Sequence, residues 1–303
     1  MQLLRGNTKC LHTVAVSPDS RFVLGAVTMY AGCYVWDLHD AKPNPRLLPP
    51  TVGTFHTLSF PSPTYLLVKV SDAWWRYDLA AGTQSEVAFP PKVLTHHAIA
   101  HPSGELFKAQ KFDRQRILTL RFAEGALKTV GAGTSTPNAP ILIAFTPDGS
   151  RYLDQEHMGS DFQRRCHLRD TATDRVVTTF VRPEECELGH WDPWHFTPDG
   201  RRVSVGVDEY VLVYDCVAGG PPVSISAVPK DGWLRGSAVH PDGRRLATIE
   251  DDRAVTFRDA ETKEVLRSYD FKMPKLTCVA FTPDGTRCVI GNNRGKVLLF
   301  DLD

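Results

Sequence analysis

The residues best suited to chemistry gather in one stretch, GHWDPWHFTPDG (residues 189–200), which holds two histidines, two tryptophans and two aspartates. Imidazole and carboxylate groups at this density suggest either metal binding or acid–base catalysis. A metal site needs three or four ligands that converge on one point. Only His190 and Asp192 share a face by strand alternation, with glutamates nearby in residues 184–187. We therefore expect neither a metal ion nor a cofactor, and no catalytic residue, in this stretch.

Other catalytic signatures are missing from the sequence. It contains no G-x-S-x-G, no Gly-rich phosphate loop and no H-E-x-x-H, the patterns of common hydrolases, nucleotide-binding proteins and metalloproteases. The only adjacent histidines, His96 and His97, would point to opposite faces of a strand. The seven cysteines form no C-x-x-C pair, and Cys33 and Cys166 lie four residues before an aspartate, where other segments have valine. We expect these thiols to fill apolar core positions.

The last four letters of the stretch, TPDG, begin a motif that recurs along the chain. Related motifs start with Ser, Thr or His, and a weaker copy stands in FPSPTYLLV. The motif prolines, separated by 41–51 residues, are Pro18, Pro61, Pro102, Pro147, Pro198, Pro241 and Pro283. Proline fixes φ at the first corner of a tight turn, Asp bonds back to the backbone, and Gly accepts the positive φ that closes the turn. The spacing predicts seven units, each with a tight turn between two strands.

A second mark ends a strand 17–23 residues after the proline in six of the units. The strands end in VWD, RYD, LRD, VYD, FRD and LFD, at Asp37, Asp78, Asp170, Asp215, Asp259 and Asp301. Apolar residues alternate before these aspartates, as in a half-buried strand. Each unit then holds about four short strands, too small a sheet to be stable alone. The sequence therefore predicts an all-β fold: a single seven-bladed β-propeller of four-stranded antiparallel blades over residues 1–303.

The two ends of the chain predict how the ring closes. The last unit ends at KVLLFDLD (residues 296–303), which supplies a third strand but no fourth. At the other end, MQLLRG (residues 1–6) aligns with KEVLRSY (residues 263–269), the fourth strand of the preceding unit. We expect residues 1–6 to complete the last blade.

These repeats resemble the WD-repeat β-propeller family along essentially the whole chain, from SPDS…VWD in the first unit to TPDG…LFD in the seventh. The resemblance implies a non-catalytic scaffold that binds a partner protein or peptide on its top rim, the end formed by the loops that enter each inner strand. Trp194 and Phe196 lie four and two residues before Pro198, where other units have apolar residues, so their register predicts core positions. The resemblance also implies that this strand lines a central channel, with His195 facing the channel. Lactonase-like and TolB-like propellers share the Pro-Asp-Gly turn. The alternative is a propeller hydrolase of lactonase type, with His12, His96, Asp192 and Arg235 at the channel mouth.

Register identifies the candidate contact residues of the top rim. The residues six positions before each motif proline are His12, Phe55, His96, Ile141, Asp192, Arg235 and Thr277. Phe55, His96 and Arg235, with nearby Trp233, are of types that anchor protein interfaces. The longest spacing, Pro147 to Pro198, carries an acidic excess that includes Glu184, Glu185 and Asp192, beside His190. We expect either a solvated loop or a docking patch near blades four and five for a partner with a basic surface.

Charge and length exclude several other classes of partner. The 303 residues contain 35 Lys and Arg and 35 Asp and Glu, so the net charge is zero. This balance argues against binding to nucleic acid or to an anionic membrane. No apolar run reaches the roughly 18 residues of a membrane helix, and the first residues lack the apolar core of a secretory signal. We expect a cytoplasmic protein that works as a monomeric ring.

Overall fold

The computed structural model describes the chain apart from residues 5, 7–8, 28–31, 49–54, 61, 71–72, 91, 112–115, 124–125, 136–139, 156–164, 184–193, 208–209, 220, 227–233, 251 and 303. In residues 55–59, 94–97, 111, 132–135, 207 and 223–226 the backbone alone is described. The described residues form strands β1 to β28 and no α-helix. Within them, no helix is long and apolar enough to cross a membrane.

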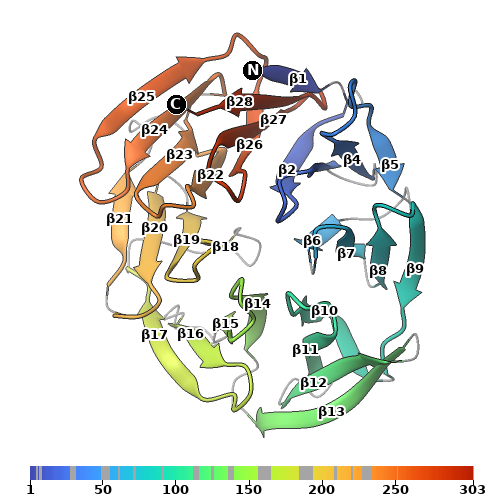
Figure 1. Ribbon diagram of the computed structural model, residues 1–303. Coiled ribbons are helices and arrows are strands. Elements are labelled where there is room, and N and C mark those ends of the chain that lie inside the picture. The colour runs from blue at the N-terminus through green and yellow to red at the C-terminus, as the bar shows by residue number, and fades with distance from the viewer. Residues whose placement is uncertain are drawn as a thin grey trace.

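The strands form seven four-stranded sheets arranged around a centre (Figure 1). Blade 1 contains β2 (Leu11–Val16), β3 (Phe22–Val27), β4 (Cys33–Asp37) and β5 (Arg46–Leu48); blade 2 contains β6 (Phe55–Ser59), β7 (Tyr65–Val70), β8 (Ala73–Asp78) and β9 (Thr83–Val87). Blade 3 contains β10 (Val93–Ala100), β11 (Leu106–Lys111), β12 (Arg116–Ala123) and β13 (Ala126–Ser135); blade 4 contains β14 (Ile141–Phe145), β15 (Arg151–Gln155), β16 (Arg165–Asp170) and β17 (Val176–Val181). Blade 5 contains β18 (Trp194–Phe196), β19 (Arg202–Val207), β20 (Tyr210–Asp215) and β21 (Val223–Ser226); blade 6 contains β22 (Gly236–Val239), β23 (Arg245–Ile249), β24 (Ala254–Asp259) and β25 (Val265–Asp270). Blade 7 contains β26 (Leu276–Phe281), β27 (Arg287–Asn292), β28 (Val297–Asp301) and β1 (Gln2–Leu4).

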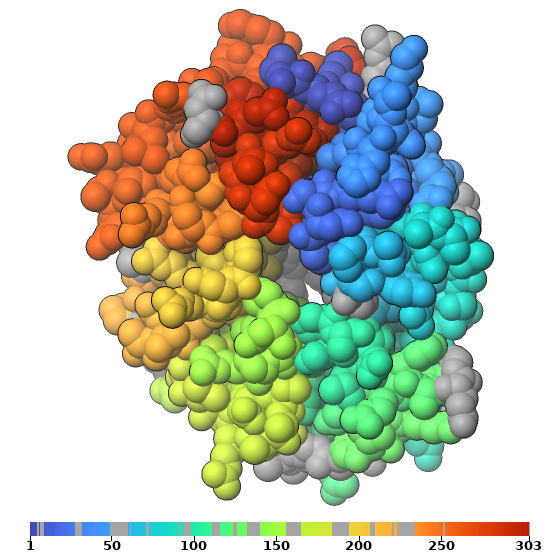
Figure 2. All heavy atoms as spheres, viewed as in Figure 1, coloured from blue at the N-terminus to red at the C-terminus, as the bar shows by residue number. Residues whose placement is uncertain are grey.

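Neighbouring strands within every blade are antiparallel. The first strand of each of blades 1 to 6 lies toward the centre and the fourth toward the outside (Figure 1). Figure 2 shows the blades in contact around the ring, with a small opening at the centre. The predicted seven-bladed propeller is confirmed.

The repeated motif forms the tight turn between the first and second strands. In blade 4, the Thr146 hydroxyl donates to Asp148 Oδ1 at 2.6 Å and accepts the Arg151 N–H at 3.1 Å. The Gly149 N–H donates to the Thr146 carbonyl at 2.9 Å, and Gly149 has a φ of 72°. The same hydroxyl-to-aspartate bond recurs at Ser17, Thr197 and Thr282, with lengths of 2.5–2.6 Å. Because these bonds close within six residues, each motif can specify its turn locally.

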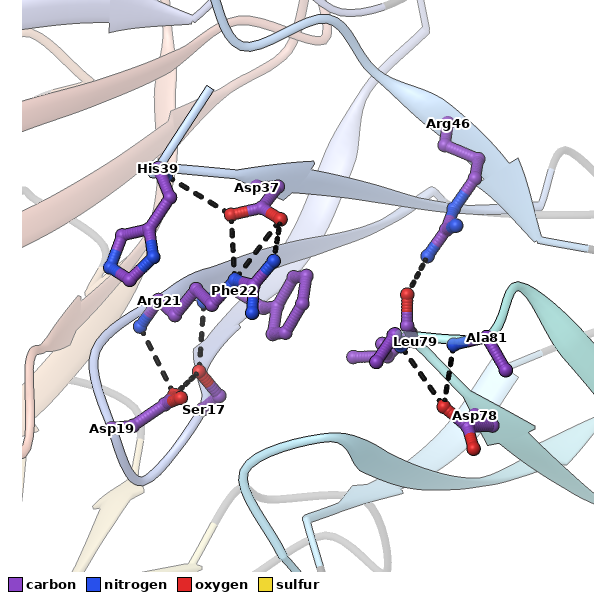
Figure 3. Close-up of polar contacts among 11 residues, drawn as sticks. Ser17, Asp19, Arg21, Phe22, Asp37, His39, Arg46, Asp78, Leu79 and Ala81 are labelled. Carbon is purple, nitrogen blue, oxygen red and sulfur yellow. Dashed lines mark hydrogen bonds and ion pairs between the residues drawn. The ribbon is translucent and has the colours of Figure 1, made fainter. Parts of the chain in front are cut away.

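The aspartate that ends the third strand forms the turn to the fourth. Asp215 Oδ1 accepts the N–H groups of Ala218 and Val217, both at 2.7 Å. These donors favour the charged carboxylate, so they hold the pKa of Asp215 below its usual range. Figure 3 shows the equivalent turn in blade 2 and, in blade 1, Asp37 bound by the guanidinium of Arg21. The recurrence of this aspartate is therefore explained by the turn and requires no catalytic role.

The core lies between blades. Between blades 4 and 5, for example, Leu153, Leu168, Phe180, Val203 and Leu212 are buried against one another. Comparable clusters join blades 1 and 2, blades 2 and 3, blades 6 and 7, and blades 7 and 1. Each sheet is therefore stabilised by burial of its faces against its neighbours.

Cys33 and Cys166 occupy these cores, as their register predicted, and both are buried. Burial raises the pKa of the Cys33 thiol to about 12, because the thiolate would lose its hydration. This thiol is a packing group.

The N-terminal strand closes the ring, as predicted. Gln2, Leu3 and Leu4 pair with Leu299, Leu298 and Val297 of β28. The Met1 amino group donates to the Asp301 carboxylate at 2.8 Å, and Leu4 is 1% exposed in the core shared by blades 7 and 1. Beyond the strand, Gly6 lies so close to the Gly295 carbonyl that a Cβ would stand 2.1 Å from its oxygen.

Removal of residues 1–6 should lower the thermal midpoint and the free energy of unfolding. The deletion leaves β28 without an outer partner and empties the Leu4 site, and emptying a buried leucine site alone costs about 2–5 kcal/mol. Thermal and denaturant unfolding followed by circular dichroism would measure both quantities. Leu3→Ser is the matched control, because that side chain is 46% exposed. A truncated chain that melts with the full-length chain would contradict closure by β1.

Candidate interaction surface

The bottom rim consists of the turns that join the first to the second strand and the third to the fourth. Links between blades run along it. His101 Nε2 lies 3.2 Å from the Gly149 carbonyl of the next blade, and His240 Nε2 lies 2.9 Å from the Gly285 carbonyl. Arg202 donates to the Gly243 carbonyl in the same manner. Polar side chains of this rim are thus committed to holding turns and neighbouring blades together.

The contacts of His101 determine which of its ring nitrogens carries the hydrogen. A carbonyl oxygen only accepts, so Nε2 must carry the hydrogen, and Nδ1 is then free to accept the Ser103 N–H at 3.0 Å. A proton on Nδ1 would remove that acceptor. Burial lowers the pKa of His101, although the Gly149 carbonyl and the nearby Asp148 and Glu105 act in the opposite direction. The folded state therefore favours the neutral ring.

The top rim consists of the loops between the second and third strands and those that lead into each inner strand. The register placed seven candidates here, and the structure describes the side chains of four: His12, Ile141, Arg235 and Thr277. Ile141 begins its inner strand, opposite Gln155, and Arg235 directly precedes one. His12 and Thr277 are the second residues of their inner strands, at the irregularity in the pairing with the second strand. His12 is exposed.

The remaining predicted contact residues are described in part or not at all. Phe55 is the first residue of β6, opposite Val70, and His96 lies within β10; their side chains are not described. Outside the described residues lie Glu184, Glu185, His190, Asp192 and Trp233. Their role in binding therefore stays a prediction.

Arg235 makes the best-defined contact of the top rim. Its Nε donates to Asp252 Oδ1 at 2.7 Å, and 48% of the arginine side chain is exposed. Asp252 has a φ of 65°, and its carbonyl accepts the Leu276 N–H of blade 7 at 2.7 Å. An exposed ion pair of this kind contributes about 0–1 kcal/mol. The guanidinium could therefore exchange Asp252 for an external carboxylate at little cost.

Residues 194–196, in the stretch GHWDPWHFTPDG, have a structural role, as their register predicted. Trp194 and Phe196 pack against the core between blades 4 and 5, and Trp194 stacks on Tyr214 with ring centroids 6.0 Å apart. His195 lies between them on β18 and is partly exposed. The surrounding protein displaces much of its hydration, so the pKa of His195 is lowered.

A buried charged cluster between blades 3 and 4 was not predicted from the sequence. Lys108 Nζ donates to Asp174 Oδ1 at 2.6 Å and to Thr119 Oγ1 at 2.9 Å, and the Tyr152 hydroxyl donates to Asp174 Oδ1 at 2.9 Å. A Lys–Tyr–Asp group has the chemistry of an active site. However, only 2% of the Lys108 side chain and 11% of the Asp174 side chain are exposed. We interpret the cluster as a clamp between two blades.

In two blades, an arginine in an ion pair occupies the position that holds an aromatic residue in other blades. In blades 1, 2 and 5 the residue before the strand-ending aspartate is a buried aromatic: Trp36, Tyr77 or Tyr214. In blade 4 it is Arg169, which binds Asp154 at 2.6 Å, and in blade 6 it is Arg258, which binds Glu250 at 3.0 Å. The letters LRD and FRD marked these arginines, but their acidic partners were missed: Asp154 lies on the second strand of blade 4, and Glu250 directly follows the second strand of blade 6.

In the described part of the chain, no group of three or more His, Cys, Asp and Glu side chains is placed to hold a metal ion. His12 on blade 1 and Arg235 on blade 6 were both placed at the channel mouth in the hydrolase alternative. The inner strand of blade 7, β26, lies between their two blades (Figure 1).

The architecture makes this chain a seven-bladed β-propeller. No family model matches the sequence, and no curated protein matches it. Among solved structures, the chain is similar to the crystal structure of the β-propeller domain of Cps50 (Swd1) from Myceliophteria thermophila. The TM-score is 0.70 and the sequence identity 15%, over 100% of both chains. At this identity the likeness concerns the fold.

Replacement of Lys108 by methionine should strongly destabilise the protein. The substitution strands the Asp174 carboxylate in the interior, and breaking a buried pair in this way costs about 3–5 kcal/mol. Adding Asp174→Asn should recover most of the loss, because the amide is neutral and asparagine tolerates the φ of 58° at this position. Denaturant unfolding of both variants and wild type tests the clamp. A single variant as stable as wild type would contradict it.

The burial of His101 predicts a loss of stability in acid. The folded-state pKa lies below the unfolded value of about 6.5, so the contribution is complete above that pH and declines as pH falls through it toward the folded pKa. The variant His101→Thr adopts the residue of other blades and should show less of this decline. The free energy of unfolding of both proteins would be measured between pH 7.5 and 5. Because His195 is present in both proteins, its contribution cancels when one curve is subtracted from the other. Parallel curves would exclude His101 as the source.

Proposed function

We propose that the chain is a non-catalytic interaction scaffold of the WD-repeat type, which binds a partner protein or peptide on its top rim. The observation that carries this proposal is a contrast between the two rims. At the bottom rim, the first residue of the motif is a hydroxyl in the same hydrogen bond at Ser17, Thr146, Thr197 and Thr282. In blades 3 and 6 it is His101 or His240, which also contacts the third residue of its motif. At the top rim, four equivalent positions hold an imidazole, an aliphatic group, a guanidinium and a hydroxyl: His12, Ile141, Arg235 and Thr277.

This contrast supports recognition of a single asymmetric partner. A ring of identical residues would offer the same contact from every blade, whereas varied residues at equivalent positions give each blade a different one. Arginine is among the residues that dominate interface energetics, and the exposed pair of Arg235 with Asp252 leaves its guanidinium within reach of a carboxylate. The four acidic residues of segment 181–194 further suggest a basic partner surface beside blades four and five. We propose that this monomeric ring acts in the cytoplasm.

Affinity capture from native lysate with mass spectrometry tests the proposal. Wild type would be compared with a top-rim variant, Asp192→Ala with Arg235→Glu. The matched control is Arg244→Glu, which repeats the arginine-to-glutamate change at an exposed residue of the bottom rim in the blade of Arg235. A partner retained by wild type and control, and lost by the top-rim variant, is the expected result, provided that all three proteins melt alike.

Either of two results would contradict the proposal. A partner that binds the top-rim variant as well as wild type would place the binding surface elsewhere. Turnover of a lactone or phosphoester that the top-rim variant loses would assign the rim to catalysis.

A further inference from the structure

The top rim of blade 7 carries a concentration of positive charge. Described residues of three segments come together there, and these segments contain six Lys and Arg and no Asp or Glu: LRGNTKC (residues 4–10), FKMPKL (271–276) and GNNRGK (291–296). The whole chain, in contrast, has equal numbers of basic and acidic residues. We propose that an acidic segment of the partner protein binds the blade 7 basic surface, which consists of Lys275, Arg294 and Lys296. This inference rests on the proposed function, because it names the chemistry that one part of the top rim recognises.

Backbone contacts hold the three segments side by side. The Asn293 N–H, in the turn between β27 and β28, donates to the Lys275 carbonyl at 2.9 Å. Gly6, in the loop that leads into β2, lies against the Gly295 carbonyl of the same turn. The turn of blade 7 therefore has both the loop into β26 and the loop into β2 as neighbours.

The turn that carries Arg294 and Lys296 is held by Asn292. The Asn292 side chain is buried, and its Oδ1 accepts the Arg294 N–H at 3.0 Å and the Lys296 N–H at 2.9 Å. The Asn292 N–H also donates to the Lys296 carbonyl at 3.1 Å. These bonds order the backbone before a ligand binds, so the entropy lost on binding is confined to the long side chains.

The three side chains of the basic surface are available to a ligand. Lys275 and Arg294 are exposed, and Lys296 is partly exposed. Among the described residues, no carboxylate forms an ion pair with any of the three. Lys272 differs, because it already pairs with Asp270 at 2.6 Å. Neighbouring cations without a counter-charge repel one another, and an anion that binds them relieves this repulsion.

The basic surface is short. Toward blade 6, the Leu276 N–H donates to the Asp252 carbonyl at 2.7 Å, which places the loop into β26 beside residues 250–253, whose sequence begins Glu-Asp-Asp. Toward blade 1, the segments between β3 and β4 and between β5 and β6 (residues 28–32 and 49–54) contain no Lys or Arg. The positive charge is therefore bounded on both sides along the rim.

These limits favour a peptide over a nucleic acid. A nucleic acid carries a negative charge at every nucleotide, so a strand that follows the rim would run from the three cations onto acidic or uncharged segments. A protein segment can place a few carboxylates opposite the cations and neutral residues elsewhere. Arginine also binds a carboxylate through two parallel hydrogen bonds, which suits Arg294 to this ligand. The chemistry recognised is thus a short run of Asp or Glu.

Fluorescence anisotropy with the purified protein tests this assignment. The probe is a labelled peptide of alternating aspartate and serine, and the comparison peptide has lysine in place of aspartate. We expect the aspartate peptide to bind better, and added salt to weaken its binding. The variant Lys275→Asp with Arg294→Glu should weaken it at least about tenfold, equivalent to 1.4 kcal/mol. Aspartate is chosen at position 275 because it tolerates the positive φ of 35° there.

The matched control is Arg201→Glu with Arg244→Glu, which makes the same change in net charge at two exposed arginines of the bottom rim. It should bind the aspartate peptide as wild type does. If the blade 7 variant melts lower than wild type, the single variants Arg294→Glu and Arg244→Glu give the same comparison at exposed positions. Hydrogen exchange should show added protection in residues 271–276 and 291–296 when the peptide is bound.

Several results would overturn the assignment: no binding of the aspartate peptide, equal binding of both peptides, equal loss in variant and control, or an oligothymidylate of equal charge that binds as tightly as the peptide. Lysate capture separates this inference from the proposed function. A partner that the top-rim variant loses and the blade 7 variant retains would support the proposed function and contradict the basic surface. A peptide that binds as expected, beside a captured partner that neither variant loses, would contradict only the proposed function.

Discussion

The ring depends on three residue pairs that join the two ends of the chain. They complete the sheet of blade 7 with a strand from the N-terminus, so the ring is closed by hydrogen bonds within a sheet. Blades 7 and 1 also share a core that includes Leu4, Leu11, Trp36 and Cys278. If the ring opened between blades 7 and 1, the faces that these two blades bury against each other would be exposed to water. Because each blade is stable only when its faces are covered, the local pairing of three residues supports the packing of the whole ring.

The parts of the fold that could be predicted from sequence are those with short-range causes. The motif turn is made by residues that contact one another within six positions, such as Thr146, Asp148 and Gly149. Repetition of that turn at near-constant spacing was enough to count the blades. The closing strand was also predictable, because the last unit lacked a strand and the N-terminus resembled one. Both inferences use patterns that can be read along the chain.

The buried charges could not be predicted in the same way. Lys108 and Asp174 are 66 residues apart and meet only because blades 3 and 4 pack together. Neither residue lies in a motif, so nothing in the repeat singles them out. Arg169 and Arg258 were visible as departures from an aromatic position, yet identifying Asp154 and Glu250 required the strand register. The top rim was predictable as a location, whereas the contacts of Arg235 depend on the loop conformation that places Asp252 beside it.

The sequence differences between repeats are constrained differently at the two rims. A change at the bottom rim must preserve a turn and a link to the next blade: His101 and His240 replace threonine, keep a polar contact to the third residue of the motif, and also reach the next turn. An exposed top-rim side chain such as His12 or Arg235 takes no part in the motif turn, so a change there is free of that constraint. Residues can therefore vary at those positions without loss of the ring. The same physical separation that keeps the framework intact makes the top rim a place where the proposed scaffold can vary its contacts.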